Sequence, residues 1–214
     1  ATAGVDTIKA AAENNNANAT TPAQTVYEAA GVTGVTSSNL AAINDALNSA
    51  PVIGTSVDNS VEVQTLVDSY NAILAAADGS ADNTASDPSQ ANYEAVGVTG
   101  IDNASEVALL GDVVDASVST AVDQVPELQA LADAVESVMA GAAGTADKPT
   151  KAQLDALGIT GVTSDNIAAI QQAIAVTNDD GTGVDDLTDL QTLVSEAASN
   201  ASTALSTIST AAQD

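Results

Sequence analysis

The amino-acid sequence predicts an all-α protein, built as three tandem three-helix bundles in an extended array. Three observations lead to this prediction. The phrase P-x(8)-G-[VI]-T-G-[VI]-[TD] occurs three times, apolar residues recur at helical spacing after each phrase, and proline and glycine stand where helices begin and end. Because self-similarity at a fixed period means that each copy is one structural unit, the chain divides into copies before a single core is sought.

The spacing of the phrase sets the expected boundaries. Its first glycine recurs after 66 and then 61 residues, at Gly31, Gly97 and Gly158. We expect three copies, each a three-helix bundle, at residues 22–81, 88–146 and 149–212, the last with an extended third helix. Residues 1–13 contain I-K-A-A-A, which resembles I-L-A-A-A near the end of the first copy. This segment is therefore expected to be the last helix of an earlier repeat.

The phrase predicts a short helix followed by a turn. Its proline suits the first helical position, its first glycine suits a left-handed helix end, and its second glycine turns the chain. The residues before the prolines are expected caps in two copies, Thr21 and Asp87, but not in the third, Lys148. The phrase's final residue is expected to cap the second helix, at Thr36, Asp102 and Thr163. The apolar anchors of the short helix are Tyr27, Tyr93 and Leu154.

The second helix is predicted from apolar residues spaced i, i+3, i+7, which form one face of a helix. The first and third copies share this stripe, at Leu40, Ile43 and Leu47 and at Ile167, Ile170 and Ile174. The second copy differs, because Glu106 falls on the position of Leu40. Val107, Leu110 and Val114 supply another stripe, so we expect a shifted or rotated helix there.

The third helix opens with a second shared motif, V-D-x(3)-[ED]-[VL]-Q-[TA]-L-[VA]. It begins at Val57, Val122 and Val184. In the third copy the apolar stripe continues in steps of three and four to Ile208, which predicts a longer helix or a coiled-coil-like seam. Asp78–Asp87 is rich in Asp, Ser, Ala and Asn, so adjacent bundles are expected to be articulated.

The composition excludes several classes of partner. Three cations, Lys9, Lys148 and Lys151, face 29 carboxylates, for a net charge of −26. Nucleic acid and anionic membranes are held by lysine and arginine, so neither is an expected partner. Charge of this size favours a soluble monomer that is more stable in high salt. No apolar run is long enough for a membrane span and no signal peptide is evident, so the chain is expected to be an excerpt of a longer one.

The motifs resemble those of the GA module, a small three-helix bundle best known for binding serum albumin. The resemblance is carried by L-D-A-L-G-I-T at residues 154–160, the apolar second helix and the motif that opens the third helix. It spans about residues 22–208. GA-like copies also occur in tandem in very large bacterial surface adhesins, where many act as stalk units. In albumin-binding modules the contact surface lies on the second helix and the start of the third. Here those stretches carry Asn44, Asp45 and Asn48, or Gln171 and Gln172.

The segment from Asn178 to Asp189 resembles an EF-hand calcium loop. Asn178, Asp180, Thr182 and Asp189 fall at the first, third, fifth and twelfth ligand positions, with Gly183 at the sixth. Asp185 stands at the eighth position, where an aliphatic residue is usual. The alternative is a glycine-rich turn followed by acids that favour a helix start.

No catalytic motif is recognisable in a chain without histidine or cysteine, so we expect no enzyme and no cofactor other than calcium. The absence of cysteine also excludes disulfides and thiolate metal sites. The sequence favours a structural stalk or spacer of a bacterial cell-surface or secreted adhesin, whose partners are neighbouring repeats of the same chain. Two alternatives stay open. One is a module that binds a host or environmental protein or glycan, and the other is a calcium-stiffened linker.

Overall fold

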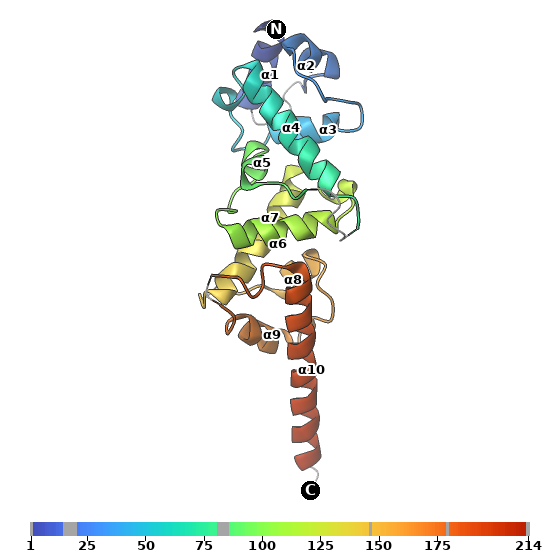
Figure 1. Ribbon diagram of the computed structural model, residues 1–214, viewed down its shortest axis with the longest axis vertical. Helices are drawn as coiled ribbons and strands as arrows, with labels where there is room; N and C mark the ends of the chain where they lie inside the picture. The colour runs from blue at the N-terminus through green and yellow to red at the C-terminus, as the bar shows by residue number, and fades with distance from the viewer. Residues whose placement is uncertain (1, 15–20, 81–85, 146, 179, 213–214) are drawn as a thin grey trace. The chain divides into compact units, whose positions relative to one another are not determined.

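The computed structural model describes residues 2–14, 21–80, 86–145, 147–178 and 180–212. Over these residues the chain forms ten α-helices and two short 3-10 helices and no β-strand, which confirms the all-α prediction (Figure 1). The last residues assigned to the first and second copies, 81 and 146, lie outside the described residues. The division into three bundles stays a prediction.

The chain divides into two compact units rather than three. Unit 1 contains Ala1–Ile101 and Val114–Gln129, and unit 2 contains Asp102–Val113 and Ala130–Asp214. The division falls inside the second copy, whose second and third helices each contribute residues to both units. Each unit therefore contains the place where one copy meets the next.

Unit 1 is built around two longer helices. Its elements are α1 (Thr2–Asn14), α2 (Gln24–Ala30), α3 (Leu40–Leu47), η1 (Gly54–Ser56), α4 (Ser60–Ala76), α5 (Gln90–Ala95), η2 (Ser119–Ala121), the last two residues of α6 and the start of α7. α1 packs against α2, α3 and η1, while α4 packs against α3 and α5. The core consists of thin aliphatic side chains and three fully buried tyrosines, Tyr27, Tyr70 and Tyr93.

Unit 2 contains most of α6 (Ala104–Asp115) and α7 (Val125–Ala142), together with α8 (Lys151–Ala156), α9 (Ile167–Ile174) and α10 (Leu187–Ala211). α9 packs against α10. The predicted stripe of α9 has its buried residues at Ile170 and Ile174. On α10, Leu190 and Val194 are fully buried.

The repeated phrase has the same backbone in all three copies. Both of its glycines adopt the left-handed conformation, the first with φ of 83°, 95° and 80° and the second with φ of 83°, 83° and 84°. A side chain is disfavoured there, so the glycines are required by the turn. The valine or isoleucine after each glycine is buried and closes the end of the helices. These residues are Val32, Val98 and Ile159 and then Val35, Ile101 and Val162.

The start of the short helix lies two residues later than predicted. The caps are Ala23, Ser89 and Thr150, so each proline precedes its cap. The reason is that the proline is buried with the apolar residue five positions on, the arrangement of a hydrophobic staple. The prediction that Thr21 and Asp87 are caps is therefore wrong. The copy without a capping side chain is the first, with Ala23, and not the third.

The caps predicted for the second helix differ between copies. Thr163 Oγ1 accepts the N–H of Asn166 at 3.3 Å, as a capping side chain does, whereas in the second copy Asn103, and not Asp102, accepts the N–H of Glu106. Asn39 and Asn166 are the caps of α3 and α9, three residues after Thr36 and Thr163. In the second copy the expected shift is present. α6 begins two residues after Asp102, whereas α3 and α9 begin four residues after the equivalent threonine. Leu110 and Val114 of its predicted stripe are fully buried.

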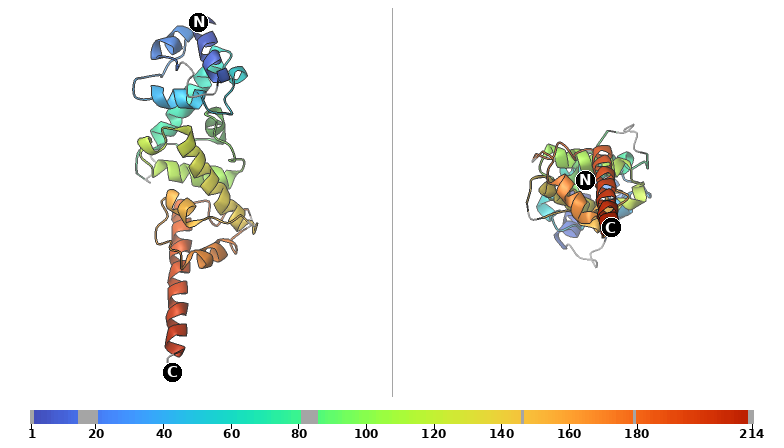
Figure 2. Two further views of the ribbon diagram at one scale, coloured as in Figure 1. Left: turned by 180° about the vertical axis from the view of Figure 1, so that it is seen from behind. Right: turned by 90° about the horizontal axis from the view of Figure 1, so that it is seen from below.

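The third helix of the third copy, α10, continues to Ala211 as predicted. Its first half is held by buried residues, but Leu205 and Ile208 are 67% and 66% exposed. Figure 2 shows this second half running beyond α9 within unit 2.

Neighbouring copies pack directly against one another. In unit 1 the long helices pack against the short helix that follows them, α1 against α2 and α4 against α5. At the second of these contacts Asn92 Nδ2 donates to Ser69 Oγ at 3.2 Å. In unit 2, Gln153 Nε2 of α8 donates to Ser137 Oγ of α7 at 2.6 Å. The expectation of articulated bundles is therefore not met at these contacts, because buried surface joins one copy to the next.

Candidate functional site

The two sequence motifs shared by the copies meet in one repeated contact. The threonine between the phrase's glycines presents its backbone N–H and C=O to the glutamine of the third-helix motif. Thr33 N donates to Gln64 Oε1 at 2.8 Å, and Gln64 Nε2 donates to Thr33 O at 3.0 Å. The same pair of bonds joins Thr99 to Gln129 and Thr160 to Gln191. We call this contact the threonine–glutamine clamp, and its role is to hold the turn to the third helix.

The turn before the second helix is held by an amide in two copies. Asn39 Oδ1 accepts the N–H of Thr36 at 2.7 Å, and Asn166 Oδ1 accepts the N–H of Thr163 at 2.7 Å. Each Nδ2 donates to the carbonyl of the phrase's second glycine, at Gly34 and Gly161. The asparagines thus replace the backbone bonds that a tight turn leaves unmade.

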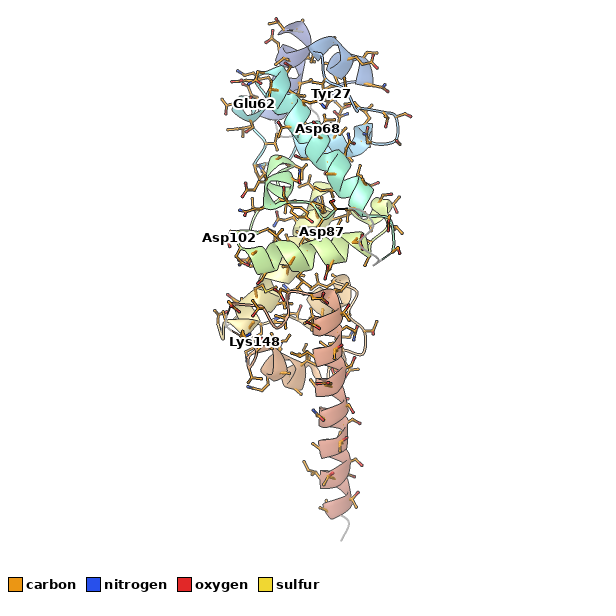
Figure 3. All side chains as sticks on the ribbon, in the orientation of Figure 1. Tyr27, Glu62, Asp68, Asp87, Asp102 and Lys148 are labelled. Carbon is orange, nitrogen blue, oxygen red and sulfur yellow. The ribbon has the colours of Figure 1, made fainter. Side chains whose placement is uncertain are left out.

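The second copy uses a carboxylate for the same purpose. Glu106 Oε2 accepts the backbone N–H groups of Asp102 and Asn103 at 2.8 and 3.2 Å (Asp102 is labelled in Figure 3). Glu106 is only 5% exposed, and burial raises the pKa of its carboxyl while the two N–H donors act in the opposite direction. This explains why a glutamate stands where the other copies have a leucine or isoleucine.

Three of the five polar residues at the positions of an albumin-type contact face, Asn44, Asp45 and Gln171, have structural partners. Asn44 is buried, accepts from the Tyr27 hydroxyl at 2.8 Å and donates to Pro22 O at 3.0 Å. Asp45 Oδ2 accepts the N–H of Val125, at the start of α7, at 2.6 Å. Gln171 Nε2 donates to Pro149 O at 3.0 Å. These side chains hold helices together.

A carboxylate of the second helix therefore caps the long helix of the following copy. The contact in unit 1 joins Asp45 to Val125, and the one in unit 2 joins Asp112 Oδ2 to Leu187 N at 2.9 Å. Negative charge at a helix start also suits the helix dipole. This contact could not be predicted from the aligned copies, because the two aspartates do not align at one position of the repeat.

Three of the four candidate calcium ligands lie together. Asp180 Oδ1 accepts from the N–H and the hydroxyl of Thr182, and Asn178 Nδ2 donates to Thr182 Oγ1. These bonds lower the pKa of the exposed Asp180 carboxyl. Asp189 instead lies in the first turn of α10, where its N–H donates to Asp186. No group of three or more acidic side chains placed to hold a metal is found within the described part of the chain. The calcium site stays a prediction.

The same loop has a packing role. Gly181 has φ of 83°, and a Cβ there would lie 2.5 Å from Met139 Sδ and 3.2 Å from Ser105 Cβ. Ser105 Oγ donates to the carbonyl of Asp180 at 3.1 Å. The loop therefore rests on α6 and α7 of the preceding copy.

A cavity of unit 2 lies beside this loop. Its volume is about 620 Å³, and it is lined by residues of α6, α7 and the loop, among them Glu106, Glu136, Met139 and Asp180. The three tyrosines do not form a binding platform, because each is at most 1% exposed. Lys151 forms an ion pair with Asp155, and Lys148 is exposed (Figure 3).

Comparison with known proteins identifies no family for this chain. No protein-family model, curated protein or solved structure matches it. Within the described residues, no helix combines the length and the apolar character that crossing a membrane requires. The GA-like resemblance therefore remains one of sequence pattern.

Proposed function

We propose that this chain is a non-enzymatic spacer, a stalk segment of GA-like repeats in a bacterial cell-surface or secreted adhesin that projects other domains. The threonine–glutamine clamp is the observation that carries the proposal. The residues that recur in all copies make the turn, close the end of the helices or form the clamp. The repeated residues therefore maintain the fold of each copy, as expected in a protein in which each unit stacks on its neighbour.

The contacts between copies support the same role. The end of a long helix buries the next short helix, and an aspartate of a second helix caps the next long helix. Such a chain extends by adding copies without a new core, and its interfaces stiffen it. Its net charge of −26 opposes association between molecules, which favours a monomer.

The competing function is a ligand-binding module in which one copy is specialised through its loop. The observation that favours it is the acid-lined cavity beside Gly181 in unit 2. A spacer and a binding module are not exclusive, because a stalk can carry a site on one copy.

Small-angle X-ray scattering on the 214-residue chain tests the spacer. A compact domain of this length has a radius of gyration of roughly 17 Å. We expect a clearly larger value and a monomeric mass by light scattering, at both 0.1 M and 1 M NaCl. A monomer with a radius near that of a compact domain would contradict the proposal.

A further inference from the structure

The helices α1, α4, α7 and α10 share a further sequence motif near their C-terminal ends. It reads [GSA]-[VYL]-x(2)-[IV]-x(2)-[AG]-A and begins at Gly4, Ser69, Ala134 and Ala204. Its five specified positions are spaced i, i+1, i+4, i+7 and i+8, so they lie together on one side of a helix. We call the surface formed by these five residues the docking face.

In α1, α4 and α7 the docking face is buried against the copy that follows in the chain. All five of its residues are buried in each of these helices. A Cβ on Gly4 would lie 2.6 Å from the backbone N of Ala30 in α2, and one on Gly141 would lie 3.1 Å from Pro149 Cδ. In α4, Ser69 is the residue that accepts the hydrogen bond from α5. The docking face is therefore where each of these helices meets the next copy.

In α10 the same face is uncovered. All five of its residues are exposed, Leu205 by 67% and Ile208 by 66%. Both also line a cavity of about 480 Å³ beside Asn166. No charged residue stands between Glu196 and Asp214. Another surface can therefore cover this face without burying a carboxylate of α10.

The docking face lies further along α10 than along the other helices of the same type. It begins five residues after the glutamine of the third-helix motif in α4 and α7, at Ser69 and Ala134, but 13 residues after Gln191 in α10. The difference of eight residues corresponds to about 12 Å of helix, at about 1.5 Å per residue. The extension of α10 therefore carries a docking face that is displaced from its own copy.

The composition of the face decides which short helix fits it. The next copy approaches α1 and α7 closely at Gly4 and Gly141, which have no Cβ. α10 has alanine at both of these positions, so it does not allow the same close approach. α4 also has a Cβ at both, on Ser69 and Ala76, and it shares the isoleucine and the two final alanines with α10. α5, which packs on α4, is therefore the model for the partner.

We propose that the docking face of α10 binds the short helix of a further repeat of this type, placed as α5 is placed on α4. The occupant is identified by continuity, because the next copy covers the same face in the other three helices and repeats of this kind stack on their neighbours. The contact joins repeats in a spacer and in a binding module alike, so the proposal does not depend on the spacer function.

An extended chain tests this contact. It consists of residues 1–214 followed directly by a second stretch of residues 80–200. Asp214 stands where Gly79 stands relative to the docking face of α4, so the added copy follows α10 as the second copy follows α4. Residues 204–212 occur once in this chain, and their amide exchange is followed by mass spectrometry. We expect exchange to be slowed roughly tenfold or more compared with the 214-residue chain, because the added copy must detach first. Exchange that is no slower would overturn the proposal.

Lengthening a helix also slows exchange at its former end, so two double variants are each measured with and without the added residues. Leu205→Ala with Ile208→Ala truncates the apolar side chains of the face and is expected to remove most of the slowing. Ser206→Ala with Thr207→Ala changes positions that correspond to two exposed residues of α1, and it is expected to keep the slowing. Equal slowing in both variants would mean that the longer helix alone protects these amides, and the proposal would fail.

Light scattering on the 214-residue chain tests the competing occupant, a second molecule bound through the same face. We expect a monomeric mass at all concentrations, because two such acidic molecules repel one another. A mass that rises with concentration, and does not rise in the variant with Leu205→Ala and Ile208→Ala, would assign the face to self-association and overturn the proposal.

Discussion

The first and second copies place a tyrosine at the same point of the phrase, yet the two hydroxyls have different surroundings. Tyr27 donates to Asn44 Oδ1, whose amide in turn reaches Pro22 O. The Tyr93 hydroxyl is buried and has no hydrogen-bond partner within the described residues. Burial raises the pKa of both tyrosines, because it disfavours the charged form. One motif residue therefore stabilises its copy more than the other does.

A residue that recurs at the same point of each copy therefore need not contribute the same free energy of folding in each copy. The ring is needed in both copies, because it fills the space beneath the short helix. The hydroxyl contributes to stability only where a residue outside the motif, Asn44, supplies a hydrogen-bond partner. An unpaired buried polar group costs about 1–3 kcal/mol, so the second copy is expected to be the less stable at this point.

The largest effect is expected from Asn44→Leu. The change leaves both the Tyr27 hydroxyl and the Pro22 carbonyl buried without a partner, which should lower the free energy of unfolding by about 2–5 kcal/mol. Because a chain with two units need not unfold in one step, the measurement is residue-resolved amide exchange of α2 and α3.

Two tyrosine variants test directly whether the hydroxyls of Tyr27 and Tyr93 contribute differently to stability. Tyr27→Phe is expected to cost about 1–3 kcal/mol, because it leaves Asn44 Oδ1 unpaired. Tyr93→Phe removes a hydroxyl that has no partner and is expected to be neutral or stabilising. Equal losses from the two changes would show that the hydroxyls are equivalent and would contradict the comparison.

The next largest effect is expected where two loops differ. Gly181→Ala places a Cβ against Met139 and Ser105 in a backbone of positive φ, so unit 2 should lose about 1–3 kcal/mol. At Gly54 in the first copy, the three atoms nearest to an added Cβ all belong to the flexible Glu13 side chain, so Gly54→Ala should cost less than about 1 kcal/mol. Amide exchange in each unit measures both.

Performing these measurements in EDTA also separates packing from metal binding. A loss from Gly181→Ala that persists without calcium belongs to the contact with α7. If calcium at millimolar concentration raises the melting temperature of the parent chain, the loop binds the ion as well, because a ligand stabilises the state that binds it. No calcium-dependent shift would remove the calcium hypothesis.

Much of the helical pattern could be predicted from periodicity and from proline and glycine. The stripes of α3 and α9 and the extension of α10 follow from spacing that a helix imposes on any buried face. The start of the short helix could not be placed from the sequence, because Thr21 is a good cap in isolation whereas burial of Pro22 moves the cap to Ala23. The cap of the second helix was predicted in the third copy, where Thr163 Oγ1 accepts the N–H of Asn166. The joining of adjacent copies was missed because a polar linker says nothing about the surfaces that it connects.

The threonine–glutamine clamp is expected to contribute a similar free energy in each copy, unlike the tyrosine hydroxyls. Gln64→Ala and Gln191→Ala each remove the side-chain bonds to one threonine and one further exposed bond within the helix, to Asp68 in the first copy and to Ser195 in the third. Each change should cost about 0.5–1.5 kcal/mol, and the two costs should agree. The cost is measured by amide exchange of the third helix in each copy. A large difference between them would mean that the clamp is not an equivalent device in the two copies.

The candidate site was only partly predictable for a related reason. Asn178, Asp180 and Thr182 are close in sequence, so their mutual bonds could be anticipated from a turn. Glu106 and Glu136 come from two other helices of unit 2, and no spacing rule joins them to Asp180. The only sequence signal was Glu106 itself, an acid at a position where the other copies have an apolar residue.

The smallest effects on stability are expected when the pH is lowered, and two aspartates should contribute with opposite signs. The pKa of Asp87 is raised by burial and by the charge of Asp115, whereas that of Asp180 is lowered by its bonds to Thr182. The folded state of unit 1 therefore holds the Asp87 proton more tightly than the unfolded chain does. As pH falls from neutral through the raised pKa, this carboxyl becomes less destabilising. Asp180 stabilises unit 2 above the ordinary value of 3.8, and this contribution is lost as pH falls below it.

Asp87→Asn and Asp180→Asn separate these contributions. For each variant, the difference in urea midpoint from the parent chain is followed as a function of pH. For Asp87→Asn this difference should vary at pH values above 3.8, the ordinary pKa of an aspartate, and for Asp180→Asn it should vary at pH values below 3.8. Amide signals of α5 and of the loop report the two units separately between pH 2.5 and pH 6. If both differences change over the same pH range and in the same direction, the two carboxyls respond to the net charge of the chain rather than to their own neighbours.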